Sequence, residues 1–80
     1  MKVSLLAFGI ARDILGQRTL SYEVDAGTRI SGLKAALISD YSEMEKLSSL
    51  AFAVNEEYVD DDYEIREGQE VVIIPPVSGG

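Results

Sequence analysis

The sequence predicts an α+β domain in which one main helix packs on one face of a mixed sheet of four to five strands. Three observations support this fold class. Apolar and polar residues alternate over residues 18–24, as in a half-buried strand. Apolar residues recur at the helical period from residue 30 to residue 41. An apolar run over residues 70–74 is stopped abruptly by two prolines.

The first part of the chain predicts two strands joined by a short helical segment. Residues 2–8 are apolar on both alternating faces, which indicates a strand inside a sheet. Residues 10–15 fit one to two helical turns, and Gly16 is the expected C-terminal cap. Residues 18–24 form the second strand, with Leu20, Tyr22 and Val24 on its apolar side.

The main helix begins near Ile30, with Thr28 or Ser31 as its expected N-cap. Its apolar stripe consists of Ile30, Leu33, Leu37, Ile38 and Tyr41. The polar residues 43–49 predict a connecting loop, with room for a short helical turn.

The last part of the chain predicts three more strands. Residues 50–54 form a buried strand, a turn covers residues 55–57, and residues 58–59 form a very short return strand. After an acidic loop and a turn at residues 67–69, residues 70–74 form the final strand. This element order is the layout of a β-grasp fold. We therefore expect a domain over residues 1–74 and an extended tail over residues 75–80.

The composition excludes most side-chain chemistry. The 80 residues contain no cysteine and no histidine, which removes thiol nucleophiles, the usual general base near neutral pH and the commonest zinc ligands. The net charge of −7 disfavours nucleic acids and anionic membranes, so we expect a protein partner with basic groups. The acidic loop at residues 60–62 lacks the alternating ligands and glycine of a calcium loop, so we predict a solvated surface and no metal site.

The N-terminus predicts a cytoplasmic protein. Its apolar stretch ends at Arg12 and Asp13, which is too short for a secretory signal peptide. No apolar run approaches the roughly 18 residues of a membrane span.

The chain end carries the most specific motif. Residues 73–80 read Ile-Ile-Pro-Pro-Val-Ser-Gly-Gly, and they follow an Ala-Val-Asn-Glu-Glu-Tyr-Val segment at residues 53–59. Together with the opening strand and the Ala-Arg and Leu-Gly pairs at residues 11–12 and 15–16, these segments resemble the small subunit of molybdopterin synthase, a family of ubiquitin-like sulfur carriers. Ile74 stands where that family often has phenylalanine.

The resemblance implies a chemical role for the last residue. An adenylating, E1-like activating enzyme would consume ATP to activate the Gly80 carboxylate, and a sulfur donor protein would convert it to a thiocarboxylate. With the large subunit of molybdopterin synthase, the carrier would then donate sulfur to cyclic pyranopterin monophosphate in molybdenum cofactor biosynthesis. No cofactor would be bound, and the carrier alone would be inactive.

The physical properties of the tail suit this role. Gly79 and Gly80 lack a Cβ atom and can pass through a narrow tunnel in an enzyme. Pro75 and Pro76 favour an extended backbone, which lowers the entropy lost when the tail inserts. The tail residues expected to contact a partner are Pro75, Pro76, Val77 and Ser78.

A sheet covered by one helix leaves its other face open. Apolar groups on that face are either exposed to solvent or covered by a partner. The candidates on this face are Leu6, Tyr58, Val72 and Ile74, of which Val72 is most simply explained as an ordinary core or surface residue. The resemblance implies that Leu6, Tyr58 and Ile74 meet the large subunit.

Other functions remain open at the level of sequence. A ubiquitin-like protein modifier would use the same adenylate to join Gly80 to a lysine through an isopeptide bond. Another alternative is a sulfur carrier that serves thiamine synthesis or tRNA thiolation. A plain binding module would not need Gly80, and a Gly-Gly ending alone is compatible with an ordinary chain terminus.

Overall fold

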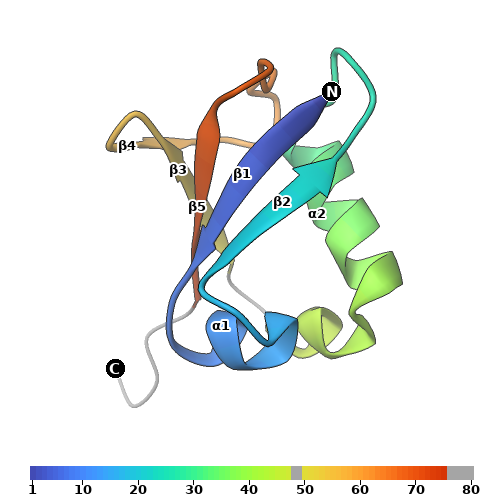
Figure 1. Cartoon of the computed structure of the whole chain (residues 1–80), viewed down its shortest axis with the longest axis vertical. Helices are drawn as coiled ribbons and strands as arrows, with labels where there is room; N and C mark the ends of the chain where they lie inside the picture. The colour runs from blue at the N-terminus through green and yellow to red at the C-terminus, as the bar shows by residue number, and fades with distance from the viewer. Residues whose placement is uncertain (48–49, 76–80) are drawn as a thin grey trace.

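The computed structural model describes residues 1–47 and 50–75 of the chain and has the expected α+β architecture (Figure 1). Two strands, two helices, a 3₁₀ helix and three further strands make up this part of the chain. Their bounds are β1 Lys2–Ala7, α1 Gly9–Leu15, β2 Thr19–Glu23, α2 Ile30–Asp40, η1 Ser42–Lys46, β3 Ala51–Val54, β4 Glu57–Val59 and β5 Glu70–Ile74.

The five strands form one mixed sheet in the order β2-β1-β5-β3-β4. The last strand of the chain is therefore the central strand of the sheet. β5 runs parallel to β1, with Leu5 opposite Val71, and antiparallel to β3. β1 lies inside the sheet, as its two apolar faces predict, and the edges are β2 and β4.

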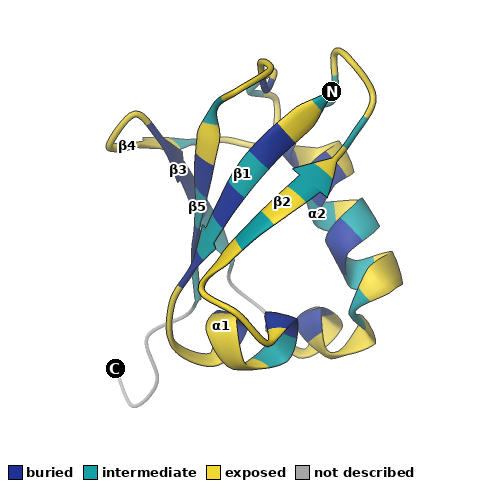
Figure 2. Cartoon of the chain, in the orientation of Figure 1, coloured by how far each residue is buried: buried dark blue, intermediate teal, exposed yellow. Residues whose placement is uncertain are grey.

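One face of the sheet packs on the helices and forms the core. α2 crosses this face in Figure 1, and α1 closes the end of the same layer. The stripe on α2 is confirmed, because Ile30, Leu33 and Leu37 are fully buried. Tyr41 lies just beyond the end of α2 and is half-buried against the core. Figure 2 shows buried and more exposed residues alternating along the strands.

The expected N-cap of α2 is wrong. Arg29 occupies the capping position, and no side chain caps the helix. The Thr28 hydroxyl instead donates a hydrogen bond to the Asp25 carbonyl at 2.6 Å. Backbone carbonyls from the loop before β5 take over the capping role. The Tyr63 carbonyl accepts from the Ile30 N–H at 3.0 Å, and the Asp61 carbonyl accepts from the next N–H at 3.1 Å.

The turns agree with the sequence except at the β3–β4 hairpin. Gly16 caps α1 with φ of 81°, as expected. The hairpin loop has two central residues, Asn55 and Glu56, whose φ angles of 54° and 67° are both positive. This is the requirement of a type I′ turn. Glu57, expected in the turn, is the first residue of β4.

No helix in the described part of the chain is long and apolar enough to cross a membrane.

Candidate docking face and tail

The open face of the sheet carries a row of side chains that runs across the strands. Residues directly opposite each other on neighbouring strands share a face. Leu6 is opposite Val72, Val72 is opposite Ala53, and Ala53 is opposite Tyr58. The structure therefore brings the predicted residues Leu6 and Tyr58 onto one face. It also places Val72 on this face, half-buried, and not in the core.

The other half of the open face is polar. Lys2 is opposite Glu23 on β2, and Ser4 lies between Ser21 on one side and Glu70 on the other. The open face thus changes from polar to apolar along the direction of β5. Its apolar half is the half that borders the end of β5, where the tail begins.

Ile74 lies at this apolar end. It is opposite Ala51 and shares the open face with Val72, two residues earlier on β5. Its side chain is half-buried. The last described residue is Pro75, which directly follows β5. The other predicted tail residues, which are Pro76, Val77, Ser78, Gly79 and Gly80, lie outside the described residues.

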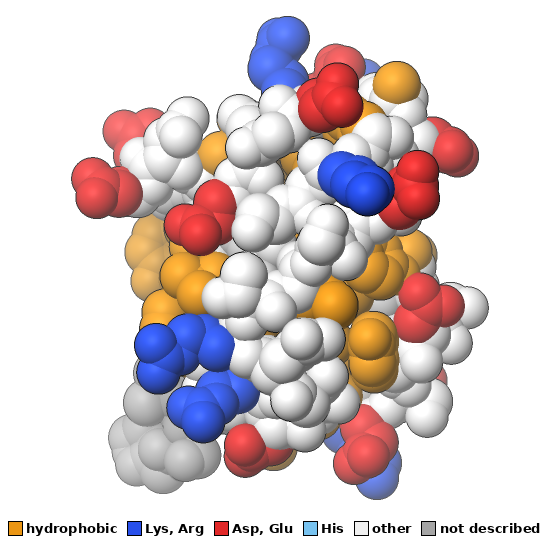
Figure 3. Space-filling view, viewed as in Figure 1, with side chains coloured by type: hydrophobic (Ala, Val, Ile, Leu, Met, Phe, Trp, Pro, Cys, Tyr) orange, Lys and Arg blue, Asp and Glu red, His pale blue; other side chains and the backbone are white. Residues whose placement is uncertain are grey.

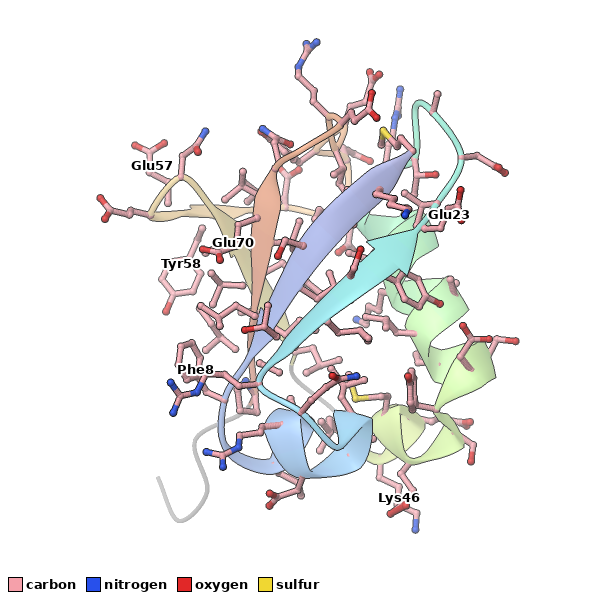
Figure 4. The ribbon with its side chains drawn as sticks, in the orientation of Figure 1. Phe8, Glu23, Lys46, Glu57, Tyr58 and Glu70 are labelled. Carbon is pink, nitrogen blue, oxygen red and sulfur yellow. The ribbon has the colours of Figure 1, made fainter. Side chains whose placement is uncertain are left out.

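Phe8 is a candidate docking residue that the sequence analysis missed. It follows β1 directly, and 47% of its surface is exposed. Phe8 is therefore more exposed than Leu6, which is half-buried. Tyr58 is 73% exposed. In Figure 4 the Phe8 and Tyr58 side chains both lie on the left of the molecule, with Tyr58 above Phe8. Phe8 and Leu6 are two residues apart, so strand alternation places them on the same face, and this signal could have identified Phe8.

Hydrophobic side chains gather on the left of the space-filling view, between acidic groups above and basic groups below (Figure 3). We define the apolar docking face as Leu6, Phe8, Tyr58, Val72 and Ile74.

The acidic loop has a structural role. The Asp60 carboxylate accepts a hydrogen bond from the Asp62 N–H at 3.0 Å and so stabilises the turn that follows β4. Within residues 1–47 and 50–75, no group of three or more acidic, histidine or cysteine side chains is arranged to hold a metal ion.

A groove of about 290 Å³ lies between α1 and η1. Ile10, Ile14 and Leu47 supply its apolar lining, and Asp13, Glu43 and Lys46 are the charged lining residues. No polar side-chain atom buried in the described structure lacks a hydrogen-bond partner. The groove thus combines apolar and charged side chains at the surface.

Tyr22 lies on β2 opposite Val3, near the start of β1. Burial, aided by the hydrogen bond that its hydroxyl donates to Asp40 at 2.5 Å, raises the pKa of Tyr22 to about 12. This bond joins β2 to the end of α2 and is structural.

Comparison with known proteins identifies the family of the chain. The ThiS family model matches residues 5–80. The chain is 32% identical to the molybdopterin synthase sulfur carrier subunit of Chlamydomonas reinhardtii over the full length of both proteins.

Solved structures share the fold. SAMP1 from Haloferax volcanii superposes with a TM-score of 0.83 at 21% identity, and the alignment covers all of both chains. The complex of subunits 1 and 2 of the molybdopterin-converting factor from Helicobacter pylori contains a chain with a TM-score of 0.68, 25% identity and full coverage of both chains. The β-grasp fold is thereby confirmed. The family match extends from β1 through the last residue of the tail, and the chain belongs to the ThiS family.

Proposed function

We propose that this protein is the sulfur carrier subunit of a molybdopterin synthase. The observation that carries the proposal is the position of the apolar docking face, which borders the end of β5 at the start of the tail. A partner that covers Leu6, Val72 and Ile74 would lie next to Pro75, where the tail begins. The similarity to curated sulfur carrier subunits of molybdopterin synthase supports the choice of this enzyme.

The reacting group would be the carboxylate of Gly80. A carboxylate is a poor electrophile, so it first attacks the α-phosphate of ATP and forms an acyl adenylate with release of pyrophosphate. Sulfur at the sulfide level, supplied by the donor, then attacks the acyl carbon, AMP leaves, and the product is a thiocarboxylate. The thiocarboxylate is a soft nucleophile that transfers its sulfur to an electrophilic carbon of cyclic pyranopterin monophosphate, and hydrolysis restores the carboxylate.

Three protein partners follow from this reaction. The large subunit would bind the docking face and supply the pterin site, and the complex from Helicobacter pylori, of subunits 1 and 2, supports this type of assembly. An adenylating, E1-like enzyme and a sulfur donor protein would load Gly80. Two loaded carriers are required for one dithiolene. We place these steps in the cytoplasm.

The proposal is tested by intact-mass spectrometry of the protein after incubation with ATP, the activating enzyme and a sulfur donor. The expected mass increase is that of one oxygen replaced by sulfur, located at Gly80 by fragmentation. A variant lacking Gly80 is the control and should remain unmodified. The proposal fails if the full chain never gains sulfur, or if the variant without Gly80 still supports cofactor synthesis in cells.

The protein-modifier alternative predicts a different product. The fold does not separate the two functions, because SAMP1, named as a small archaeal modifier protein, has the same architecture. Isopeptide adducts of Gly80 on cellular lysines would favour the modifier. Loss of thiamine or of thiolated tRNA, with intact molybdenum cofactor, in a strain lacking this protein would favour the other carrier pathways.

A further inference from the structure

β1 and β5 separate at the base of the tail. The two strands run in parallel with Ala7 opposite Ile73, so the continuing register would bring Gly9 opposite Pro75. At this point β1 ends, Phe8 is still extended with φ of −128°, and Gly9 turns the chain into α1 with φ of 56°. β5 ends at the same level, and Pro75 follows it.

The Pro75 ring lies against Gly9. A Cβ atom added to Gly9 would lie 3.4 Å from the Cγ atom of Pro75, which is van der Waals contact. A methyl group would therefore fit in ordinary contact, and a larger side chain at residue 9 would extend beside the Pro75 ring. At three other glycines with positive φ, which are Gly16, Gly27 and Gly68, an added Cβ would meet no atom within 4 Å. Gly9 therefore combines a positive φ with a close neighbour.

We propose that Gly9 is a positioning residue for the tail. It forms a seat for the Pro75 ring and thereby sets the direction in which the tail leaves the domain. This inference rests on the proposed function, because direction matters only if the tail must enter an enzyme.

The chemistry of proline explains why a seat is useful at this position. Pro75 has a fixed φ and no N–H, so it cannot extend the hydrogen-bond ladder that holds β5 in the sheet. Packing of its ring against Gly9 is a contact that does not depend on the missing backbone donor. Without a Cβ atom, Gly9 lets the Pro75 ring lie beside its backbone, and its positive φ turns the chain from β1 into α1.

The test compares the variants Gly9→Val and Gly68→Val. Both place a β-branched residue at a positive φ, so both carry the same kind of backbone strain. Only the change at residue 9 also meets Pro75. Gly9→Asn is a milder variant that guards against misfolding, because asparagine tolerates positive φ. Gly9→Ala should resemble the original protein in tail reactivity, since a methyl group fits.

The measurement is the steady-state rate of Gly80 adenylation by the activating enzyme. We expect Gly9→Val to lower kcat roughly tenfold to a hundredfold with little change in KM, because docking persists while the reacting carboxylate is misplaced. Gly68→Val should leave both constants unchanged. The variant Pro75→Ala, combined with Gly9→Val, should recover part of kcat, because it removes the atoms that the valine displaces.

Two results would overturn the inference. One is a Gly9→Val variant that folds and reacts like Gly68→Val. The other is the absence of a nuclear Overhauser effect between the Gly9 Hα and Pro75 Hγ protons in the free protein. If the original protein is not adenylated at all, the proposed function fails, and the proton contact still decides whether the seat exists.

Discussion

The two faces of the sheet are built from the same strands and yet differ in how far their side chains are buried. On β5, Val71 and Ile73 are fully buried against the helices, whereas Val72 and Ile74 are half-buried on the open face. The alternation of a strand thus places core residues and open-face residues side by side within five consecutive positions. A small domain without disulfides needs its core residues to be distinct from its open-face residues, because its single core provides only a small free energy of unfolding.

The comparison is tested most strongly by changing adjacent isoleucines. We expect Ile73→Ala to lower the free energy of unfolding by about 4 kcal/mol, because it opens a cavity in the core. Ile74→Ala should cost about 1 kcal/mol, because its side chain is partly solvated in the free protein. Urea denaturation of both variants measures the difference. Equal losses would mean that the open face also holds the domain together.

Substitutions on the open face should weaken binding to the partner more than they lower the stability of the domain. We expect Tyr58→Ala to weaken binding to the large subunit by about 2 kcal/mol, roughly 30-fold, because exposed aromatic residues are frequent binding hot spots. Its stability should change little, since Tyr58 is 73% exposed. Ile10→Ala is the matched control, because Ile10 is 50% exposed but lies in the groove between α1 and η1. Calorimetric titration that ranks Ile10 above Tyr58 would contradict the assignment of the docking face.

The hairpin that presents Tyr58 allows a smaller test. Glu56 has a positive φ, which costs an L-residue energy that glycine avoids. We expect Glu56→Gly to raise the free energy of unfolding by about 0.5 kcal/mol, the net of relieved strain and a more flexible unfolded chain. Glu57→Gly removes the same charge from a strand residue and should be destabilising. Chemical denaturation distinguishes the two, and a loss of stability in Glu56→Gly would contradict the turn geometry.

The smallest expected effect occurs only at alkaline pH, at the rim of the core. Because the folded pKa of Tyr22 is about 12 and the unfolded value is near 10, the folded state holds its proton more tightly. The associated stability is present below pH 10 and is lost as the pH rises toward 12. Between pH 10 and pH 12, the free energy of unfolding of the Tyr22→Phe variant should therefore fall less steeply than that of the original protein. Parallel slopes for the two proteins would show that Tyr22 does not contribute.

The sequence predicted the strands and the helix well where one face is buried. Alternation around Leu20 and Tyr22, and the helical stripe through Leu33 and Leu37, follow directly from burial on one side. The prediction failed at the start of α2, because the capping carbonyls come from Asp61 and Tyr63, which are distant in sequence. Local patterns contain no information about such partners.

The candidate site was predicted only in part, because some of its contacts also join residues that are distant in sequence. Strand parity places Leu6 and Ile74 on one face, but the exposure of Phe8 depends on where β1 bends away from the sheet. The neighbour that crowds Gly9 is Pro75, at the other end of the domain sequence, and only the parallel pairing of β1 with β5 brings it there. The motif at the tail was readable from sequence because it is contiguous.

The central position of β5 has a consequence for how the protein is made. The strand that completes the sheet is also the last of the five to leave the ribosome. The pairing of β1 with β5 joins the two ends of the domain and cannot form on a partly synthesised chain. A chain that stops before β5 lacks both its central strand and the glycine that would react. The sheet can therefore be completed only after β5 has been synthesised.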